Sequence, residues 1–309
     1  MIERARPLLG TMVAIRVDAN DGLSPVQAHR AIDTAFAQVE LIHRLMSFHR
    51  PDSDVMRVNR ATAGRVVAVH PHTWRVLHWA QRFAAASAGV FDVCVARRLV
   101  AWGELPPPSD RAPDPQADWR DLQLLPRQRV SYRRPVWIDL GGIAKGYAVD
   151  CAALTLRRAG VRRGAVNAGG DLRLLGIEPQ DVVLDARTQP EEMASGHAGA
   201  AAALAASAVA VLRIGQAAVA TSCAGAMQPD GRHHQVHVRG AGGSAVMAGA
   251  AASVIASRCL VADALTKVVL AQPPQQAEPV LRRFGACAYR HDDSGWHGVG
   301  ATAPRWMNH

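Results

Sequence analysis

The clearest hydrophobic pattern of the chain lies at residues 136–154, where a short apolar run meets two glycines and then continues at helical spacing. Residues 136–140 have the length and composition of a buried strand, and apolar residues recur at the intervals of a helix from 143 to 154. The glycines at 141 and 142 let the backbone come close to a ligand. The pattern therefore predicts a strand, a tight turn and a helix that begins at the glycines.

A helix that begins at a glycine turn directs its unpaired N–H groups and the positive end of its dipole toward that turn. Such a site suits an anionic ligand, for example a phosphate group. Lys145 lies in the first turn of the predicted helix and adds a positive charge there. The alternative interpretation is a tight strand-to-helix connection in which the glycines serve a steric purpose only.

The same periodicities predict strands and helices along the rest of the chain. Helices are expected to begin at Ser24–Pro25 and at His70–Pro71 and to occur at 260–270 and around 279–284, with a turn at Trp296. Strands are expected at 12–17, 122–125, 129–132, 209–214, 217–222, 252–257 and 286–289, and on both sides of the glycine turn at 169–170. We expect 122–125 to pair with 129–132, and 209–214 with 217–222.

The length of 309 residues allows a substantial core, and we expect a single domain that covers residues 1–309. Within it, residues 104–118 are rich in proline and acids and resemble a surface excursion. Residues 190–206 are of low complexity and are expected to form a loosely ordered connection.

The chain carries a net charge of +9, which raises the question of nucleic-acid binding. The arginines, however, are scattered as isolated pairs such as Arg97–Arg98 and Arg282–Arg283, with no basic run interleaved with aromatic residues. This distribution is typical of a solvated basic surface and argues against a nucleic-acid partner.

No stretch is apolar and long enough to span a bilayer, and no export signal is recognised at Met1, so a cytoplasmic location is expected. The five cysteines are widely spaced and contain no CxxC pair; they are Cys94, Cys151, Cys223, Cys259 and Cys287. We interpret them as reduced thiols that mostly fill the core, and not as a disulfide framework or a zinc site.

Lysine occurs at only two positions, Lys145 and Lys267, whereas every other basic residue among the 35 Lys and Arg is arginine. A chain that uses arginine almost everywhere retains lysine chiefly where a compact ammonium does something that a planar guanidinium does not. Lys267 lies in the apolar helix 260–270 at the i+4 position from Asp263, and Thr266 lies at i+3, so the three share one face. A buried polar triplet is one interpretation, and an ordinary intrahelical ion pair is the other.

Three further features are candidates for ligand contacts. Asp92 is a carboxylate inside an apolar run, so it must either cap local backbone or touch a ligand. Asn167 precedes two glycines and either directs its amide at a ligand or supports a turn. The stretch from Gly231 to Val238 contains three histidines, and here a polar-faced edge strand competes with a metal site.

Taken in order, several segments resemble the bacterial FAD:protein FMN transferases, formerly described as thiamine-biosynthesis lipoproteins. The most specific segment is Asp139 to Asp150, which reads Asp-Leu-Gly-Gly-Ile-Ala-Lys-Gly-Tyr-Ala-Val-Asp. The other segments that are similar to family motifs are Leu9-Gly10-Thr11, Met46-Ser47-Phe48 with Asp52-Ser53 and Asn59, Gly89 to Val93, Val166 to Asp171, Ala220-Thr221-Ser222 and Ala262 to Leu265.

The resemblance implies an α+β fold with mixed or antiparallel sheets and flanking helices, in the T-fold-like architecture of flavin transferases. It also implies FAD as substrate, Mg²⁺ on its pyrophosphate, and an acceptor flavoprotein whose Ser or Thr hydroxyl receives FMN. The flavin nucleotide would contact Leu9, Phe48, Val90, Phe91, Asp92, Asp139, Lys145, Asn167 and Val236. The metal site would involve Gly142, Asp263, Thr266 and Lys267, and the catalytic residues would be His234 and Lys145.

The sequence departs from the family pattern in two places. The family usually has threonine four residues after the metal-binding acid, whereas here that position is Lys267 and Thr266 lies one residue earlier. An ammonium at this position could take the place of the metal, so we expect an altered metal dependence. In the block that usually reads His-Ile-Ile-Asp-Pro, His234 remains as a candidate general base, but the acid is replaced by His237.

These observations favour transfer of FMN from FAD to a protein hydroxyl with release of AMP. Phosphoryl transfer requires mostly positioning and charge neutralisation, which backbone N–H groups, a lysine and an oxygen-ligated magnesium provide. The two departures leave two alternatives: an FAD-binding protein without transfer activity, and a magnesium-dependent hydrolase that converts FAD into FMN and AMP.

Overall fold

The fold was analysed in a computed structural model of the 309-residue chain. The structure describes residues 1–18, 22–186, 209–225, 240, 243, 246, 250–292 and 294–300. The expected connection at 190–206 and the histidine-containing stretch at 231–238 lie outside the described residues.

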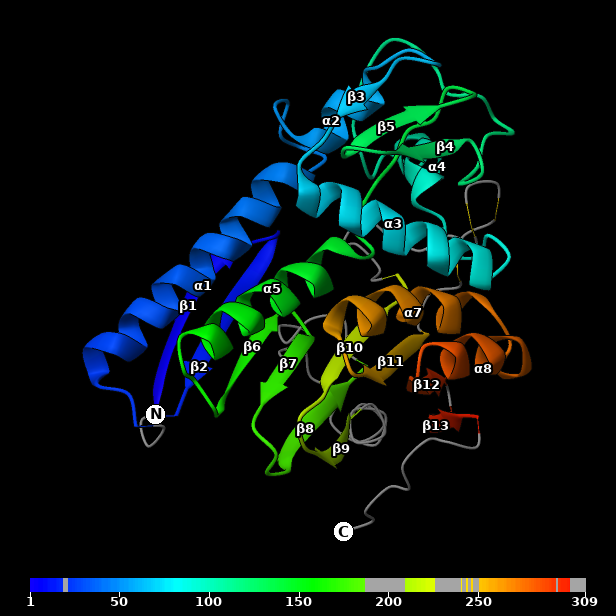
Figure 1. Ribbon diagram of the computed structural model, residues 1–309. Coiled ribbons are helices and arrows are strands. Elements are labelled where there is room, and N and C mark those ends of the chain that lie inside the picture. The colour runs from blue at the N-terminus through cyan, green and yellow to red at the C-terminus, as the bar shows by residue number, and fades with distance from the viewer. Residues whose placement is uncertain are drawn as a thin grey trace, which may run out of the picture.

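An antiparallel sheet of eight strands forms the centre of the molecule, in the order β1-β2-β6-β7-β10-β11-β12-β13 (Figure 1). Its strands are β1 (Ile2–Leu8), β2 (Thr11–Val17), β6 (Gly164–Ala168), β7 (Asp171–Leu175), β10 (Ala218–Cys223), β11 (Ala251–Ala256), β12 (Cys287–Asp292) and β13 (Gly295–Val299). The sheet and the helices below confirm the expected α+β class.

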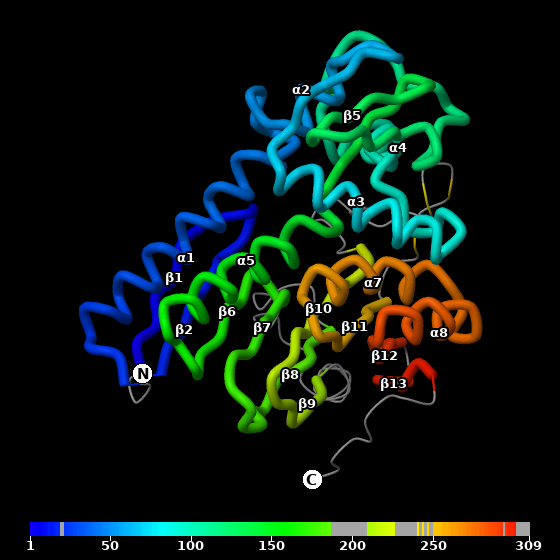
Figure 2. The backbone as a smooth tube through the Cα atoms, viewed as in Figure 1, coloured from blue at the N-terminus to red at the C-terminus, as the bar shows by residue number. Residues whose placement is uncertain are grey.

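Helices cover one face of this sheet in a row, as Figure 2 shows. They are α1 (Pro25–Met46), α5 (Ala144–Arg158), α7 (Cys259–Ala271) and α8 (Pro274–Arg283). α1 contacts β1 and β2, α5 contacts β6 and β7, α7 contacts β10 and β11, and α8 contacts β12 and β13. The main hydrophobic core lies between the sheet and these helices.

The opposite face of the sheet is covered over part of its area by the two-stranded ribbon β8 (Gln180–Asp185) and β9 (Val209–Ile214). Leu184 and Leu212 of this ribbon pack with Leu174, Ile255 and Tyr289 of the large sheet and form a second, smaller core.

A third unit lies beyond the C-terminal end of α1 (Figure 1). It contains the sheet of β3 (Val67–Ala68), β5 (Arg129–Tyr132) and β4 (Leu122–Leu125), together with α2 (Asp54–Asn59), η1 (Val93–Val95) and α4 (Ala96–Ala101). The long helix α3 (Pro71–Ala86) connects this unit with the helical layer. The excursion at 104–118 also belongs here, because Arg60 donates to the Pro108 carbonyl and Arg97 to the Pro115 carbonyl.

Local signals in the sequence explain where the helices begin. Ser24 and Gln27 form a reciprocal capping box at the start of α1, and Pro25 occupies its first turn. The N-terminus of α7 is capped at long range: the carboxylate of Asp150 on α5 accepts the backbone N–H groups of Cys259 and Leu260, at 2.9 and 3.0 Å. These bonds satisfy donors that a helix end otherwise leaves unpaired.

Four expectations about local structure were wrong. Residues 136–140 form no strand ladder, because the side chain of Asn59 takes the partner's place and exchanges two hydrogen bonds with the Ile138 backbone, at 2.7 and 2.9 Å. The following helix begins at Ala144 and not at the glycines. The strand 209–214 pairs with β8 and not with 217–222. Trp296 lies in strand β13 and not in a turn.

Among the described residues, no helix is both long and apolar enough to cross a membrane.

Candidate functional site

A cavity of 680 Å³ lies where the C-terminal end of α1 approaches the N-terminal end of α5 and the middle of α7. Its volume falls in the usual range of small-molecule sites, about 300–1,000 Å³. The walls are formed by Leu9, Gly10, Ile42, His43, Met46, Ser47, Phe48, His49, Arg50, Leu99, Glu104, Leu105, Asp139, Gly141, Gly142, Ala144, Lys145, Ser222 and Lys267. The two lysines of the chain therefore line the same cavity.

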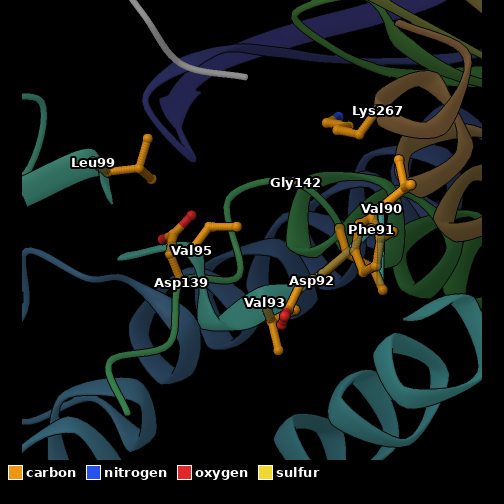
Figure 3. A pocket seen from close by; sticks show the side chains of 10 residues that line it. Val90, Phe91, Asp92, Val93, Val95, Leu99, Asp139, Gly142 and Lys267 are labelled. Atoms are coloured by element: carbon orange, nitrogen blue, oxygen red, sulfur yellow. The ribbon is translucent and has the colours of Figure 1, made fainter. Parts of the chain in front are cut away.

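A smaller hollow of 60 Å³ adjoins the cavity and shares Leu99, Asp139, Gly142 and Lys267 with it. Its remaining walls are Val90, Phe91, Asp92, Val93, Val95 and Ile143. Figure 3 shows Lys267 reaching from α7 above the backbone of Gly142, with Val90 and Phe91 on the same side and Asp139 opposite. The structure thus brings together most of the residues that the sequence singled out, although they are widely separated along the chain.

Leu9 and Gly10 reach the cavity through the tight turn between β1 and β2. Both adopt the left-handed conformation, with φ of 57° and 72°. For a leucine this conformation is uncommon and costs on the order of 1–3 kcal/mol. The turn therefore holds the apolar side chain of Leu9 at the cavity wall at a cost in conformational free energy.

Asp139 precedes the glycine turn and is held by it. Its Oδ2 accepts the Gly141 N–H at 2.9 Å, and a Cβ at Gly141 would lie 2.9 Å from the same oxygen. Asp139 is half-buried and borders the cavity. Burial raises the pKa of its carboxyl group, and the hydrogen bond from the Gly141 N–H opposes this shift. Any larger residue at 141 would displace the Asp139 carboxylate from this position, because the carboxylate folds back onto that residue.

Asp92 serves the local backbone. Its two oxygens accept the N–H groups of Cys94 and Trp119, at 2.8 and 3.1 Å. Burial raises the pKa of Asp92 to about 6, and the two N–H bonds oppose this shift. Of the two roles considered for this embedded acid, the structure shows the capping role, and the carboxylate also ties the segment near 119 to the smaller hollow.

Two lysine–aspartate pairs form a buried charge cluster at the floor of the cavity. The Lys267 Nζ lies 2.5 Å from Asp263 Oδ1, and the Lys145 Nζ lies 3.4 Å from Asp171 Oδ2. Asp263 and Asp171 are 0 and 1 % exposed, whereas the lysine side chains are 17 and 28 % exposed and face the cavity. The cluster therefore presents ammonium groups to the cavity and keeps the carboxylates behind them.

The pKa values of the two carboxylates of the cluster are shifted in opposite directions. Burial opposes ionisation of Asp263, but Lys267, Lys145 and the Gly146 N–H outweigh it and hold its pKa below the usual value. Burial and the negative charge of Asp263 raise the pKa of Asp171 to about 7, although Lys145 acts in the opposite direction. Neither oxygen of Asp171 has a hydrogen-bond partner within the described residues, so its ion pair with Lys145 is its main polar contact.

Two hydroxyl groups complete the cluster. Thr266 donates from Oγ1 to the Asp263 carbonyl at 2.7 Å, and its hydroxyl lies 2.8 Å from Ser222 Oγ on β10. Ser222 also accepts a hydrogen bond from Lys267 Nζ at 3.2 Å and lines the cavity. This hydroxyl pair links α7 to the central sheet directly beneath the cavity.

The residues of the predicted metal site do not fit a divalent ion in their present arrangement. Lys267 donates from Nζ to Asp263 Oδ1, to the Asp263 carbonyl at 3.0 Å and to Ser222 Oγ, so the oxygens that a hard cation would bind already contact an ammonium. The second Asp263 oxygen accepts the Gly146 N–H at 3.0 Å. Within the described ranges, no three His, Cys, Asp or Glu side chains are arranged to hold a metal ion.

Not all predicted site residues meet at the cavity. Asn167 accepts the Gly170 N–H at 3.1 Å and supports the turn between β6 and β7; it is not among the described residues that line the cavity. The predicted contacts at His234 and Val236 lie outside the described residues.

Several residues of the cavity and of the charge cluster were not assigned a role from the sequence. Asp171 and Ser222 were recognised only as parts of motifs, yet both belong to the charge cluster. A signal was present in each case, because Asp171 directly follows a glycine turn and Ser222 ends a strand. Leu99 on α4, and Glu104 and Leu105 at the start of the excursion, carried no such signal, since they reach the cavity only through the tertiary fold.

The ApbE family model matches residues 9–289 of the chain. Among curated relatives, the FAD:protein FMN transferase of Rhodobacter capsulatus is 29% identical over 180 residues, which cover 55% of this chain and 34% of that protein. The FAD:protein FMN transferase of Vibrio cholerae is 26% identical over 186 residues, which cover 57% of this chain and 55% of the relative. The matches thus span about a third to about half of the length of these relatives.

Solved structures agree in fold. The ApbE protein of Thermotoga maritima superposes with a TM-score of 0.76 at 24% identity, and the match covers 96% of each chain. The flavin transferase ApbE of Vibrio cholerae gives a TM-score of 0.75 at 22% identity, with 97% of each chain covered. At these identities the similarity establishes the architecture.

Proposed function

The chain belongs to the ApbE family, and on that premise we propose that it transfers FMN from FAD to a Ser or Thr hydroxyl of an acceptor protein and releases AMP. The proposal draws on the relatives named FAD:protein FMN transferase. The observation that carries it in this chain is that Lys145 and Lys267, the only two lysines, line one cavity. Two ammonium groups at the floor of a cavity suit the two negative charges of a pyrophosphate.

In the proposed complex, the flavin half of FAD contacts the apolar part of the cavity, which includes Leu9 and Phe48. Val90, Phe91 and Asp92 border the adjoining hollow, and Asp139 lies between the two spaces. Lys145 and Lys267 then face the pyrophosphate. Asn167 is proposed to act only through the turn that it supports, and Val236 remains a proposed FAD contact.

The proposed reaction is a displacement at the flavin-side phosphorus. The acceptor hydroxyl oxygen forms a bond to that phosphorus, and the bond between this phosphorus and the bridging oxygen breaks, so AMP leaves with the bridging oxygen. His234 is the proposed general base for the hydroxyl proton. Lys145 neutralises charge on the phosphoryl oxygens while Asp171 holds its ammonium in place.

Magnesium was expected at Gly142, Asp263, Thr266 and Lys267, but the contacts of Lys267 argue against a divalent ion there. No step of the proposed reaction is therefore assigned to a metal. The same contacts favour a second candidate function, the binding of FAD without transfer, because an ammonium polarises a phosphoryl oxygen less strongly than a divalent ion does.

A direct test is the incubation of the purified protein with FAD and a library of Ser- and Thr-containing peptides, followed by chromatography for AMP and mass spectrometry for FMN-modified peptides. We expect AMP and FMN-peptide in equal amounts, with both products lost in Lys145→Met. Bound FAD with neither product would favour the second candidate. AMP and free FMN without modified peptide would favour hydrolysis.

A further inference from the structure

We propose that the ammonium of Lys267 is the built-in cation of this site and takes the place of a divalent ion in FAD binding. This inference rests on the proposed FAD site but concerns how the negative charge of the bound pyrophosphate is balanced. The observation that carries it is the set of three oxygens around Lys267 Nζ: Asp263 Oδ1 at 2.5 Å, the Asp263 carbonyl at 3.0 Å and Ser222 Oγ at 3.2 Å.

These oxygens come from two elements and are fixed by further contacts. Asp263 is fully buried, and its other oxygen is bound by the Gly146 N–H. Its carbonyl also accepts the Thr266 hydroxyl, whose oxygen lies 2.8 Å from Ser222 Oγ. A carboxylate, a carbonyl and a hydroxyl held in this way form a cage of hard oxygen donors, which is the environment that Mg²⁺ and Ca²⁺ prefer.

The stem of Lys267 passes close to the glycine turn on its way to the cage. A Cβ placed at Gly142 would lie 3.3 Å from Lys267 Cε, so the stem crosses the glycine turn in close contact. Figure 3 shows this side chain directed away from α7, above Gly142. Gly142 thus provides the space through which the charge of Lys267 reaches the cavity.

One contact of the ammonium is able to exchange for substrate. The bond to Ser222 Oγ is the longest of the three, and both Ser222 and Lys267 line the 680 Å³ cavity. A pyrophosphate oxygen that enters from the cavity replaces the serine hydroxyl as the third acceptor of Lys267 Nζ. The bonds from Nζ to Asp263 Oδ1 and to the Asp263 carbonyl remain. The ammonium then bridges Asp263 and the pyrophosphate, as a metal ion would.

The test measures FAD binding by isothermal titration calorimetry, in EDTA and in millimolar Mg²⁺. We expect the dissociation constant of the wild-type protein to differ less than about twofold between the two conditions. Lys267→Ala, which removes the charge and the stem, should bind FAD at least about tenfold more weakly in EDTA. Its affinity should recover in Mg²⁺, because the Asp263 and Ser222 oxygens are then free to bind the ion. Lys267→Met removes the charge but fills the space, so it should stay weak in both.

Two controls separate a charge effect from a folding effect. Arg282→Met breaks an exposed i,i+4 ion pair with Glu278 on α8, away from the cavity, and should leave FAD binding unchanged. The double variant Asp263→Asn/Lys267→Met removes both charges of the buried pair, so it avoids an unpaired buried carboxylate. It should fold and still bind FAD weakly.

Because the chain has only two lysines, their ammonium signals in ¹⁵N NMR provide a second readout that needs no activity. Addition of FAD in EDTA should shift the signal that is missing in Lys267→Met. A wild-type dissociation constant that tightens tenfold or more with Mg²⁺, an unaffected Lys267→Ala, or a failure of Mg²⁺ to restore Lys267→Ala would each overturn the inference. AMP release is not part of this test, so a protein that binds FAD without metal but never cleaves it would refute the transfer reaction alone.

Discussion

The backbone N–H of Gly146 on α5 donates to Asp263 Oδ2 on α7 at 3.0 Å, across 117 positions of sequence. This bond is possible because the two helices almost touch at the glycine: a Cβ there would lie 2.4 Å from the Cys259 carbonyl oxygen and 2.7 Å from Asp263 Cβ. Gly146 lies in the first turn of α5, and its N–H orients the carboxylate that binds Lys267. The positive charge at the cavity thus depends on close packing between α5 and α7.

Gly146→Ala should therefore destabilise the protein, although alanine is intrinsically the better helix former by about 1 kcal/mol. The added methyl group meets backbone atoms that cannot yield, so we expect a loss of about 2 kcal/mol or more in the free energy of unfolding. Chemical denaturation measures this loss. The control is Leu154→Ala on the exposed side of the same helix, where a change below about 1 kcal/mol is expected. A Gly146→Ala protein as stable as the wild type would show that the helices separate freely.

Asp150→Ala should also weaken the contact between α5 and α7, because it removes the acceptor of two N–H groups at the start of α7. The expected cost is about 1–2 kcal/mol, as for other helix caps, and urea unfolding measures it. Asp150→Asn keeps one acceptor oxygen and should lose less. If both variants unfold at the wild-type urea concentration, the cap does not contribute to stability.

Asn59→Ala should impair FAD binding although Asn59 is not among the described residues that line the cavity. The substitution removes both hydrogen bonds to the Ile138 backbone and leaves buried groups unpaired, at a cost of roughly 2–3 kcal/mol in stability. Asp139 directly follows Ile138 and should lose its fixed position at the cavity. FAD affinity, measured by flavin fluorescence, should therefore fall severalfold. Unchanged affinity in a folded Asn59→Ala protein would contradict this positioning role.

The segment around Asn59 also illustrates what the sequence predicts and what it does not. Periodicity located the main helices and most strands, and the glycine turn identified the cavity wall at Gly142 and Lys145. The same periodicity predicted a strand at 136–140. An apolar run does not reveal whether its backbone will bond to a neighbouring strand or to an asparagine side chain. The partner lies 79 positions away, and such pairing depends on tertiary structure.

Helical spacing likewise predicted that Asp263 and Lys267 share one face of α7, and the structure confirms it. It did not predict that Ser222 would supply the third oxygen of the cage, because β10 meets α7 only in the folded protein. Pairing of β9 with β8 was missed for the same reason, since short strands carry little information about their neighbours.

The pH dependence of stability should carry a contribution from Asp92. Its pKa is about 6 in the folded protein and near 3.8 when unfolded, so between these values the folded state binds more protons. Stability should therefore fall as pH rises through this window, by on the order of 3 kcal/mol for this group. Below the window the carboxyl is protonated in both states and the penalty is absent.

The comparison of wild type with Asp92→Asn isolates this contribution, because the amide does not titrate. Near pH 4 the Asp92 carboxyl of the folded wild type is protonated and, like the amide, keeps one carbonyl oxygen as acceptor for the Cys94 or Trp119 N–H, so the two proteins should have similar stability. As pH rises toward 7, the wild type should lose stability relative to Asp92→Asn. Parallel pH profiles for the two proteins would exclude a raised pKa at Asp92.

In the proposed reaction the site cleaves FAD at the flavin-side phosphorus, and incubation of the purified protein with FAD in ¹⁸O-labelled water tests this cleavage without a known acceptor. The cavity is open, so water is able to replace the acceptor hydroxyl. We predict slow formation of FMN and AMP with the ¹⁸O label in the FMN phosphate, in EDTA as well as in Mg²⁺. Label in AMP, or FAD that stays intact in both conditions, would exclude cleavage at the flavin-side phosphorus.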